Sequence, residues 1–221
     1  MATSRIINSA FKRMHQAFGP QDWWPGDSPL EIIVGAVLTQ NTNWANVEKA
    51  INNLKKEKVL SLKALKEINT NKLAGLIRSS GYYNIKAKRL KNIINFIFSE
   101  YRGSLKKMFS ESDEELRKKL LCVNGIGRET ADSIMCYAAQ KKVFVVDAYT
   151  RRIFSRLGVC KKDIEYDVIQ ALFYKHLKND YQLFNEYHAL MVNLGKNYCK
   201  PKPLCHNCPL KGMLNGKCKL T

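Results

Sequence analysis

The sequence predicts an all-α protein, and three observations lead to that prediction. Ten segments carry apolar residues at three- and four-residue spacing, which is the pattern of amphipathic helices. The connections between them are short and contain Gly, Asn, Ser or Pro. Only residues 143–146 are β-like, and that run is too short to imply a sheet. No repeat of fixed period is present, so a helical solenoid is not supported.

The predicted helices follow one another between residues 31 and 194. Each has apolar residues on one side, and turn-forming residues separate most neighbours. In order, they span 31–37, 46–55, 62–68, 73–78, 87–98, 114–121, 130–139, 148–157, 166–176 and 181–194.

The charge balance indicates a polyanionic partner. The chain has 221 residues, with 37 Lys and Arg against 19 Asp and Glu, a formal net charge of +18. Such a surplus favours nucleic acid over other partners. The 45% hydrophobic content supplies enough apolar material for a core, which argues against disorder. Because neither a membrane span nor a hydrophobic signal core is visible, we expect a cytoplasmic, nucleoid-associated protein without membrane contact.

A cysteine-rich segment follows residue 198 and cannot order itself by burial alone. Its thiols are spaced by five, two and nine residues, and they are Cys199, Cys205, Cys208 and Cys218. A close Cys pair with two flanking cysteines is typical of a four-thiolate metal site. Both zinc and a [4Fe–4S] cluster satisfy this pattern, and the spacing does not separate them.

A Gly-x-Gly turn joins two of the predicted helices. Gly125 and Gly127 can adopt backbone angles closed to other residues, and Ile126 between them can enter the core. Together with the start of the next helix, at Arg128 and Thr130, this turn would present backbone N–H groups to one DNA phosphate. An ordinary helix–helix turn is the alternative, and the positive charge favours the phosphate site.

Asp147 directly follows the apolar run 143–146 and precedes a predicted helix. As an N-cap it would accept hydrogen bonds from backbone N–H groups. It would also be an anion held beside an apolar wall, so a structural and a chemical role are compatible.

Taken together, these motifs resemble the endonuclease III superfamily of helix–hairpin–helix DNA glycosylases. Residues 121–131 resemble the hairpin, 145–147 the lead-in to the catalytic aspartate, and 38–42 the motif whose Gln enters the duplex. Residues 81–87, which include Tyr83 and Lys86, resemble a second DNA-facing loop. The resemblance covers nearly the whole chain in the right order.

The resemblance implies a two-lobed fold. One lobe would be a six-helix barrel over 25–136, with the helix–hairpin–helix at 114–138. The other would combine an N-terminal helix, within 1–24, with the C-terminal helices of 137–221 and carry the cysteine loop 199–218. In this family four cysteines hold a [4Fe–4S] cluster, usually with spacings of six, two and five, so the longer last spacing here makes Cys218 the least certain ligand. We expect a monomer acting on double-stranded DNA that contains a damaged base.

The same resemblance assigns roles to single residues. Asp147 would stabilise the positive charge that develops on the sugar as the N-glycosidic bond breaks. Gln40 would fill the gap left by the flipped base. Bifunctional members carry a Lys where this chain has Glu129, and a carboxylate cannot form the imine that leads to strand cleavage. We therefore expect a monofunctional glycosylase that leaves an intact abasic site.

The three tryptophans indicate which kind of damaged base the enzyme would remove. Trp23, Trp24 and Trp44 lie within 22 residues of one another, and Pro25 follows the first pair. Core packing is the usual role of a single Trp, but two or three indoles could sandwich a flat base. Indole faces attract a cationic alkylated purine. With Glu129, these residues resemble the 3-methyladenine DNA glycosylase III branch, in which they line the base pocket.

Two other functions remain open on the sequence. A thymine or uracil mismatch glycosylase would remove a neutral base, and pocket hydrogen bonds would then matter more than indoles. A non-catalytic DNA-binding module with a structural metal is the alternative from a different class.

Overall fold

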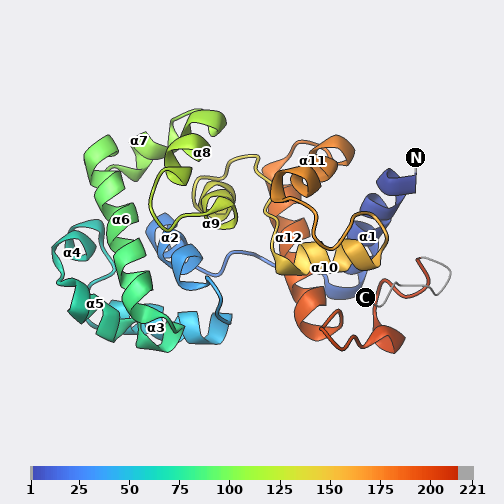
Figure 1. Ribbon diagram of the computed structural model, residues 1–221, viewed down its shortest axis with the longest axis horizontal. Coiled ribbons are helices and arrows are strands. Elements are labelled where there is room, and N and C mark those ends of the chain that lie inside the picture. Colours follow the sequence, from blue (N-terminus) through green and yellow to red (C-terminus); the bar gives the residue numbers. More distant parts are fainter. Residues whose placement is uncertain (1, 214–221) are drawn as a thin grey trace. The chain divides into compact units, whose positions relative to one another are not determined.

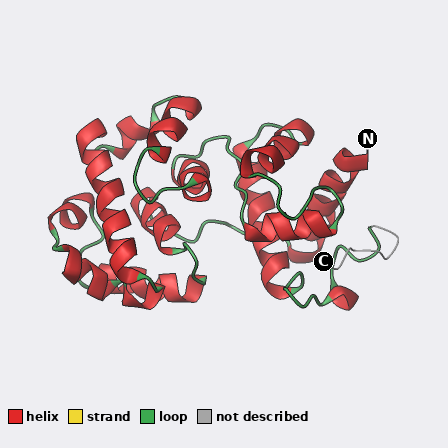
Figure 2. Cartoon of the chain, in the orientation of Figure 1, coloured by secondary structure: helices red, strands yellow, loops and turns green. Residues whose placement is uncertain are grey.

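The predicted all-α fold class is confirmed. The computed structural model describes residues 2–213, and this part of the chain contains helices, turns and loops but no strand (Figure 2). None of the helices in it combines the length and apolar character that crossing a bilayer requires. The α-helices are α1 (Ala2–Phe18), α2 (Pro29–Leu38), α3 (Trp44–Lys56), α4 (Leu62–Glu67), α5 (Thr70–Leu76), α6 (Tyr83–Tyr101), α7 (Leu105–Phe109), α8 (Asp113–Leu121), α9 (Arg128–Ser133), α10 (Ala148–Arg156), α11 (Tyr166–His176) and α12 (Tyr181–Asn197). Short 3-10 or π elements are η1 (Arg78–Ser80), η2 (Ile134–Ala138) and η3 (Cys205–Asn207).

The chain divides into two compact units. One is continuous, Pro25–Lys141, and the other joins Met1–Trp24 to Lys142–Thr221. The chain leaves the continuous unit and returns to the discontinuous one after Lys141, whereas the sequence analysis placed that boundary after Cys136. The difference arises because the predicted helix 130–139 ends as a π-helix, η2, which packs against α2 and so stays with the continuous unit.

Helix α2 is the centre of the continuous unit (Figure 1). It is apolar on all sides and contacts α3, α6, α9 and η2, as expected of a helix that is buried all round. Ser28 caps its N-terminus and Pro29 occupies the first turn, where the missing N–H costs nothing. The charged residue of α2 itself, Glu31, is buried and paired with Lys55 at 2.8 Å.

The core of the discontinuous unit is aromatic. Helices α1, α10, α11 and α12 surround it, and α12 packs on both α1 and α10. Phe144 stacks on Phe173 with ring centroids 3.9 Å apart, and Phe154, Phe184 and Tyr187 meet them edge to face. Phe144 comes from the β-like run of the sequence, which is extended and fully buried but pairs with no strand in the described residues.

Helix α7 escaped the sequence analysis. It has only five residues, too few for a periodic apolar pattern, and is defined by local signals instead. Gly103 adopts a positive φ of 75° and Ser104 caps the helix by accepting a hydrogen bond from the Lys107 N–H.

Candidate active site and nucleic-acid interface

Asp147 is the N-cap of α10 and is held by a capping box. Its Oδ1 accepts hydrogen bonds from the Thr150 N–H at 2.7 Å and from the Thr150 hydroxyl at 2.8 Å. The residue is only 8% exposed. Local sequence explains this placement, because Asp is a favoured N-cap and Thr150 stands at the N3 position that a capping box requires. The carboxylate is therefore fixed before any ligand binds.

His188 is the second partner of this carboxylate, and the sequence analysis assigned it no role. His188 belongs to α12, and its Nε2 lies 3.5 Å from Asp147 Oδ2. Burial raises the pKa of Asp147, but the His188 charge, its hydrogen bond and the two bonds from Thr150 outweigh burial and lower the pKa overall. A lone histidine in an apolar helix carries no local signal of such a contact.

If base release depends on the Asp147 carboxylate, as the family resemblance implies, His188→Gln should shift the acidic limb of the pH–rate profile of base release to higher pH. Glutamine retains an N–H donor but lacks the charge that helps to hold the pKa of Asp147 down. Because a carboxyl with a lowered pKa loses its charge only as the pH falls through that value, a smaller lowering brings the loss at higher pH. The other groups beside the carboxyl, Thr150 and Tyr149, are unchanged. Single-turnover rates between pH 4 and 8 measure the limb, and exposed His15→Gln is the control.

An unshifted acidic limb in His188→Gln, with the fold intact, would show that the charge of His188 does not act on Asp147.

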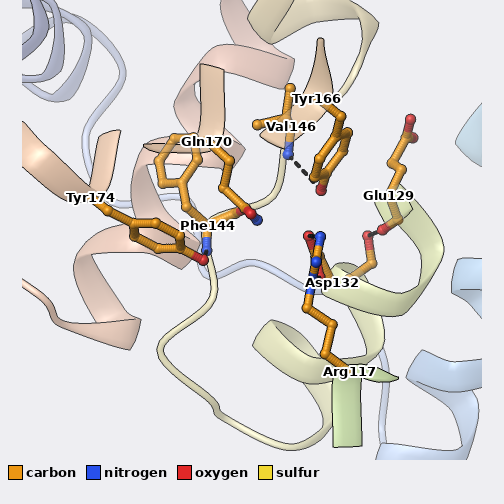
Figure 3. A network of polar contacts seen from close by, with 9 residues as sticks. Arg117, Glu129, Asp132, Phe144, Val146, Tyr166, Gln170 and Tyr174 are labelled. Carbon is orange, nitrogen blue, oxygen red and sulfur yellow. Dashed lines mark hydrogen bonds and ion pairs between the residues drawn. The ribbon is translucent and has the colours of Figure 1, made fainter. Parts of the chain in front are cut away.

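The hairpin lies between α8 and α9 and is anchored from both sides. Gly125 has φ +90°, as the sequence predicted, but Gly127 has φ −91° and needs no glycine-only conformation. Ile126 is buried, while Arg128 and Glu129 are exposed on the first turn of α9 and Thr130 is buried. Below the turn, Arg117 binds the buried Asp132 through Nε at 2.7 Å and Nη2 at 3.1 Å (Figure 3).

Gln40 is bonded to this hairpin. Its Nε2 donates to the Gly125 carbonyl at 3.0 Å and to the Thr130 hydroxyl at 2.9 Å. Arg89 from α6 donates to the Gln40 Oε1, so the amide is held at both ends. The loop after α2 and the hairpin therefore form one hydrogen-bonded assembly, and insertion of Gln40 into DNA would require these bonds to break.

Lys86, predicted to contact DNA, is buried instead. Its amine donates to the Leu38 carbonyl at 2.8 Å and to the Ser80 carbonyl at 2.6 Å, so it caps the carboxyl end of α2. Burial, followed by the charge of Arg89, lowers the pKa of Lys86 to about 8. The sequence analysis took it for a surface lysine because its partner at the end of α2, Leu38, lies 48 residues away in the chain.

The aromatic that this loop exposes is Tyr82. Its side chain is 70% exposed and its φ is +46°, whereas the predicted Tyr83 is half-buried beneath Arg78. The loop thus offers an aromatic face and the neighbouring Ile85, which is 50% exposed.

The three tryptophans are all half-buried. Trp23 and Trp24 end the first segment of the discontinuous unit, and their rings meet edge to face at 5.4 Å and 66°. The two rings of this pair are therefore not parallel. Trp44 is the first residue of α3 in the other unit, and Pro25 is exposed.

The cysteine loop begins at the end of α12. Cys199 is buried and accepts a hydrogen bond from Arg156 Nη1 at 3.3 Å. Cys205 is the first residue of η3, and Cys208 directly follows that turn. Burial raises the pKa of the Cys208 thiol, and backbone N–H groups of Leu210 and Lys211 oppose that rise. The fourth predicted ligand, Cys218, lies outside the described residues.

These thiols fit a metal group by their chemistry. Soft thiolate donors, N–H groups directed at sulfur and a buried guanidinium suit an anionic iron–sulfur or zinc centre. Within residues 2–213, no three His, Cys, Asp or Glu side chains are placed so that they could hold a single metal ion.

Comparison with known proteins agrees with this architecture. Residues 34–179 match the family described as "HhH-GPD superfamily base excision DNA repair protein". The chain is 48% identical to the "Putative DNA repair glycosylase" of Methanocaldococcus jannaschii over 93% of its length and 94% of that protein. It is 32% identical to the H. pylori 3-methyladenine DNA glycosylase MagIII, solved with 1,N6-ethenoadenine, with a TM-score of 0.77 over 89% of this chain and 98% of that one.

A further solved structure shares the fold. A non-covalent endonuclease III–DNA complex gives a TM-score of 0.84 at 24% identity, covering 100% of this chain and 97% of that one.

The helical fold, the glycine hairpin and the capped aspartate define a helix–hairpin–helix DNA repair protein. More narrowly, the chain belongs to the HhH-GPD superfamily of base excision repair proteins and is a DNA glycosylase.

Proposed function

We propose that this glycosylase hydrolyses the N-glycosidic bond of alkylated purines such as 3-methyladenine. The observation that carries the proposal is the buried Asp147 carboxylate, which accepts two hydrogen bonds from Thr150 and faces His188 Nε2 at 3.5 Å. These contacts outweigh burial and lower the pKa of Asp147. Such an anion stabilises the oxocarbenium character of the sugar and orients the attacking water. A cationic alkylated base leaves without a general acid, so this one carboxylate is sufficient chemistry.

The tryptophans support the choice of base. Trp23, Trp24 and Trp44 keep part of their indole surface exposed, and each indole face attracts a cation by about 1–2 kcal/mol when desolvated. Together with Pro25, they are the residues proposed to contact the base. The 32% identity to a 3-methyladenine DNA glycosylase points in the same direction.

The enzyme is proposed to act without strand cleavage. Glu129 is exposed in the first turn of α9, at the position where bifunctional relatives of this class carry the imine-forming lysine. A carboxylate cannot form that imine. The product would be an intact abasic site.

Double-stranded DNA is the proposed partner, bound by a monomer. The hairpin at Gly125–Gly127 with Arg128 and Thr130 would hold one phosphate, and the loop at Tyr82 and Tyr83 would make a second contact. The net charge of +18 supplies the attraction. Gln40 would enter the duplex after leaving its bonds to the hairpin.

The proposed function is tested on duplex DNA treated with a methylating agent. Released bases are separated, and the DNA is run on a denaturing gel before and after alkali. We expect free 3-methyladenine and nicks only after alkali. Release of thymine or uracil from mismatched duplexes, with no alkylated base released, would establish a mismatch glycosylase instead. Nicks without alkali would contradict the role given to Glu129.

We also propose a [4Fe–4S] cluster, held by Cys199, Cys205, Cys208 and Cys218. Bound there, it would tie the C-terminal loop to α12 and α10. We expect protein purified without oxygen to be brown and to contain about four irons per chain. Cys205→Ser should lose iron and colour, whereas Cys122→Ser, an exposed cysteine outside the loop, should not. Colourless protein with one zinc per chain would overturn the cluster.

A further inference from the structure

The segment that leads into Asp147 is buried along its whole length. Residues Val143, Phe144, Val145 and Val146 are at most 4% exposed, and they run extended into the α10 cap. Buried backbone N–H and C=O groups need hydrogen-bond partners. In a sheet a neighbouring strand would supply them, and in the described residues this segment has no such neighbour.

Side chains of α11 supply these partners. Tyr174 Oη accepts from the Phe144 N–H at 3.2 Å, and Gln170 Nε2 donates to the Phe144 carbonyl at 2.7 Å. Tyr166 Oη accepts from the Val146 N–H at 3.3 Å. The three side chains are four residues apart and so project from one face of the helix. Figure 3 shows them directed at the segment, and we name them the α11 ladder.

The ladder runs antiparallel to the segment, and its last rung adjoins Asp147. Tyr174 and Gln170 bind Phe144, and Tyr166 binds the backbone N–H of Val146, the residue immediately before Asp147. Asp147 is thus fixed on both sides along the chain: the capping box holds it to Thr150, and Tyr166 holds the residue before it, Val146. Apolar packing of Val146 alone does not fix the segment along its own axis, whereas directional hydrogen bonds do.

We propose that the α11 ladder, through Tyr166 and Gln170, is a positioning device that sets the place of the Asp147 carboxylate for catalysis. This proposal rests on the proposed function, in which Asp147 is the catalytic group. Catalysis is sensitive to such placement, because a shift of about 1 Å can cost a hundredfold in rate. DNA affinity, which depends on other residues, should not depend on the ladder.

The decisive variants remove one polar group and keep the shape. Tyr166→Phe deletes the hydroxyl that accepts from Val146, and Gln170→Met deletes the amide that binds Phe144. The matched control is Tyr187→Phe, which deletes another buried tyrosine hydroxyl of the same unit, one that donates to the Ile7 carbonyl at 2.7 Å. All three should lower Tm, since each loses buried hydrogen bonding.

The readout is the single-turnover rate of base release, with the Kd for abasic-site DNA measured in parallel. We expect Tyr166→Phe and Gln170→Met to lower the rate about tenfold or more at saturating enzyme, with Kd within about twofold of the original. Tyr187→Phe should retain the original rate despite its lower Tm. That separation of rate from stability would not arise from a merely structural role.

Two results would overturn the proposal. If all three variants release base at the same rate, the ladder contributes to stability alone. If Kd rises in step with the fall in rate, the ladder serves DNA binding. Asp147→Asn, tested beside them, keeps the two proposals apart: base release that survives Asp147→Asn refutes the catalytic aspartate, whereas release lost there but unaffected in Tyr166→Phe refutes only the ladder.

Discussion

Asp147→Asn is expected to lower the rate of base release about a thousandfold while DNA affinity stays within about twofold, a loss of stabilisation near 4 kcal/mol. Asparagine has the same shape, and its side-chain oxygen still accepts from Thr150, so the α10 cap persists. In the proposed mechanism this substitution removes the negative charge that stabilises the developing oxocarbenium ion. This effect is the largest that we expect for any single side chain.

The measurement uses single-turnover release from methylated duplex DNA, together with Kd for abasic-site DNA and a thermal melt. Asp163→Asn, an exposed aspartate of the same unit, is the control and should change none of the three. Base release that persists in Asp147→Asn would remove Asp147 from the mechanism. Loss of DNA binding with an unchanged melt would reassign it to the binding of DNA.

Gly125→Ala is expected to lower the free energy of unfolding by about 3 kcal/mol. A Cβ at this position would lie 2.3 Å from Arg89 Cγ and 2.9 Å from Cδ, and φ is +90°, where a side chain is strained. Relief requires Arg89 to withdraw from Gln40, so the hydrogen-bonded assembly of the hairpin would open as well. We therefore expect weaker DNA binding in addition to lower stability.

The matched control for stability is Gly127→Ala in the same hairpin. At Gly127 φ is −91° and a Cβ would meet nothing within 4 Å. Its urea midpoint should be unchanged or slightly higher, because alanine reduces the entropy of the unfolded chain. Equal midpoints for the two variants would show that the close approach of Arg89 to Gly125 is not a constraint.

Much of the fold and part of the candidate site could be predicted from the sequence. Helix α12 follows from apolar periodicity over 181–194, and the α10 cap follows from Asp147 with Thr150 three residues later. The cysteine loop follows from spacing. Lys86 was misplaced because nothing near it in the chain indicates that its partner is the Leu38 carbonyl, 48 residues away.

The sequence by itself therefore determined the helical class, the glycine hairpin, the capped aspartate and the cluster of thiols. Each of these depends on residues within a few positions of one another, where periodicity, capping and spacing act. Tertiary structure decided the pairing of His188 with Asp147, the bonds of Gln40 to the hairpin and the α11 ladder. These contacts join residues 20 to 90 positions apart, and only the packing of whole helices brings such residues within hydrogen-bond distance.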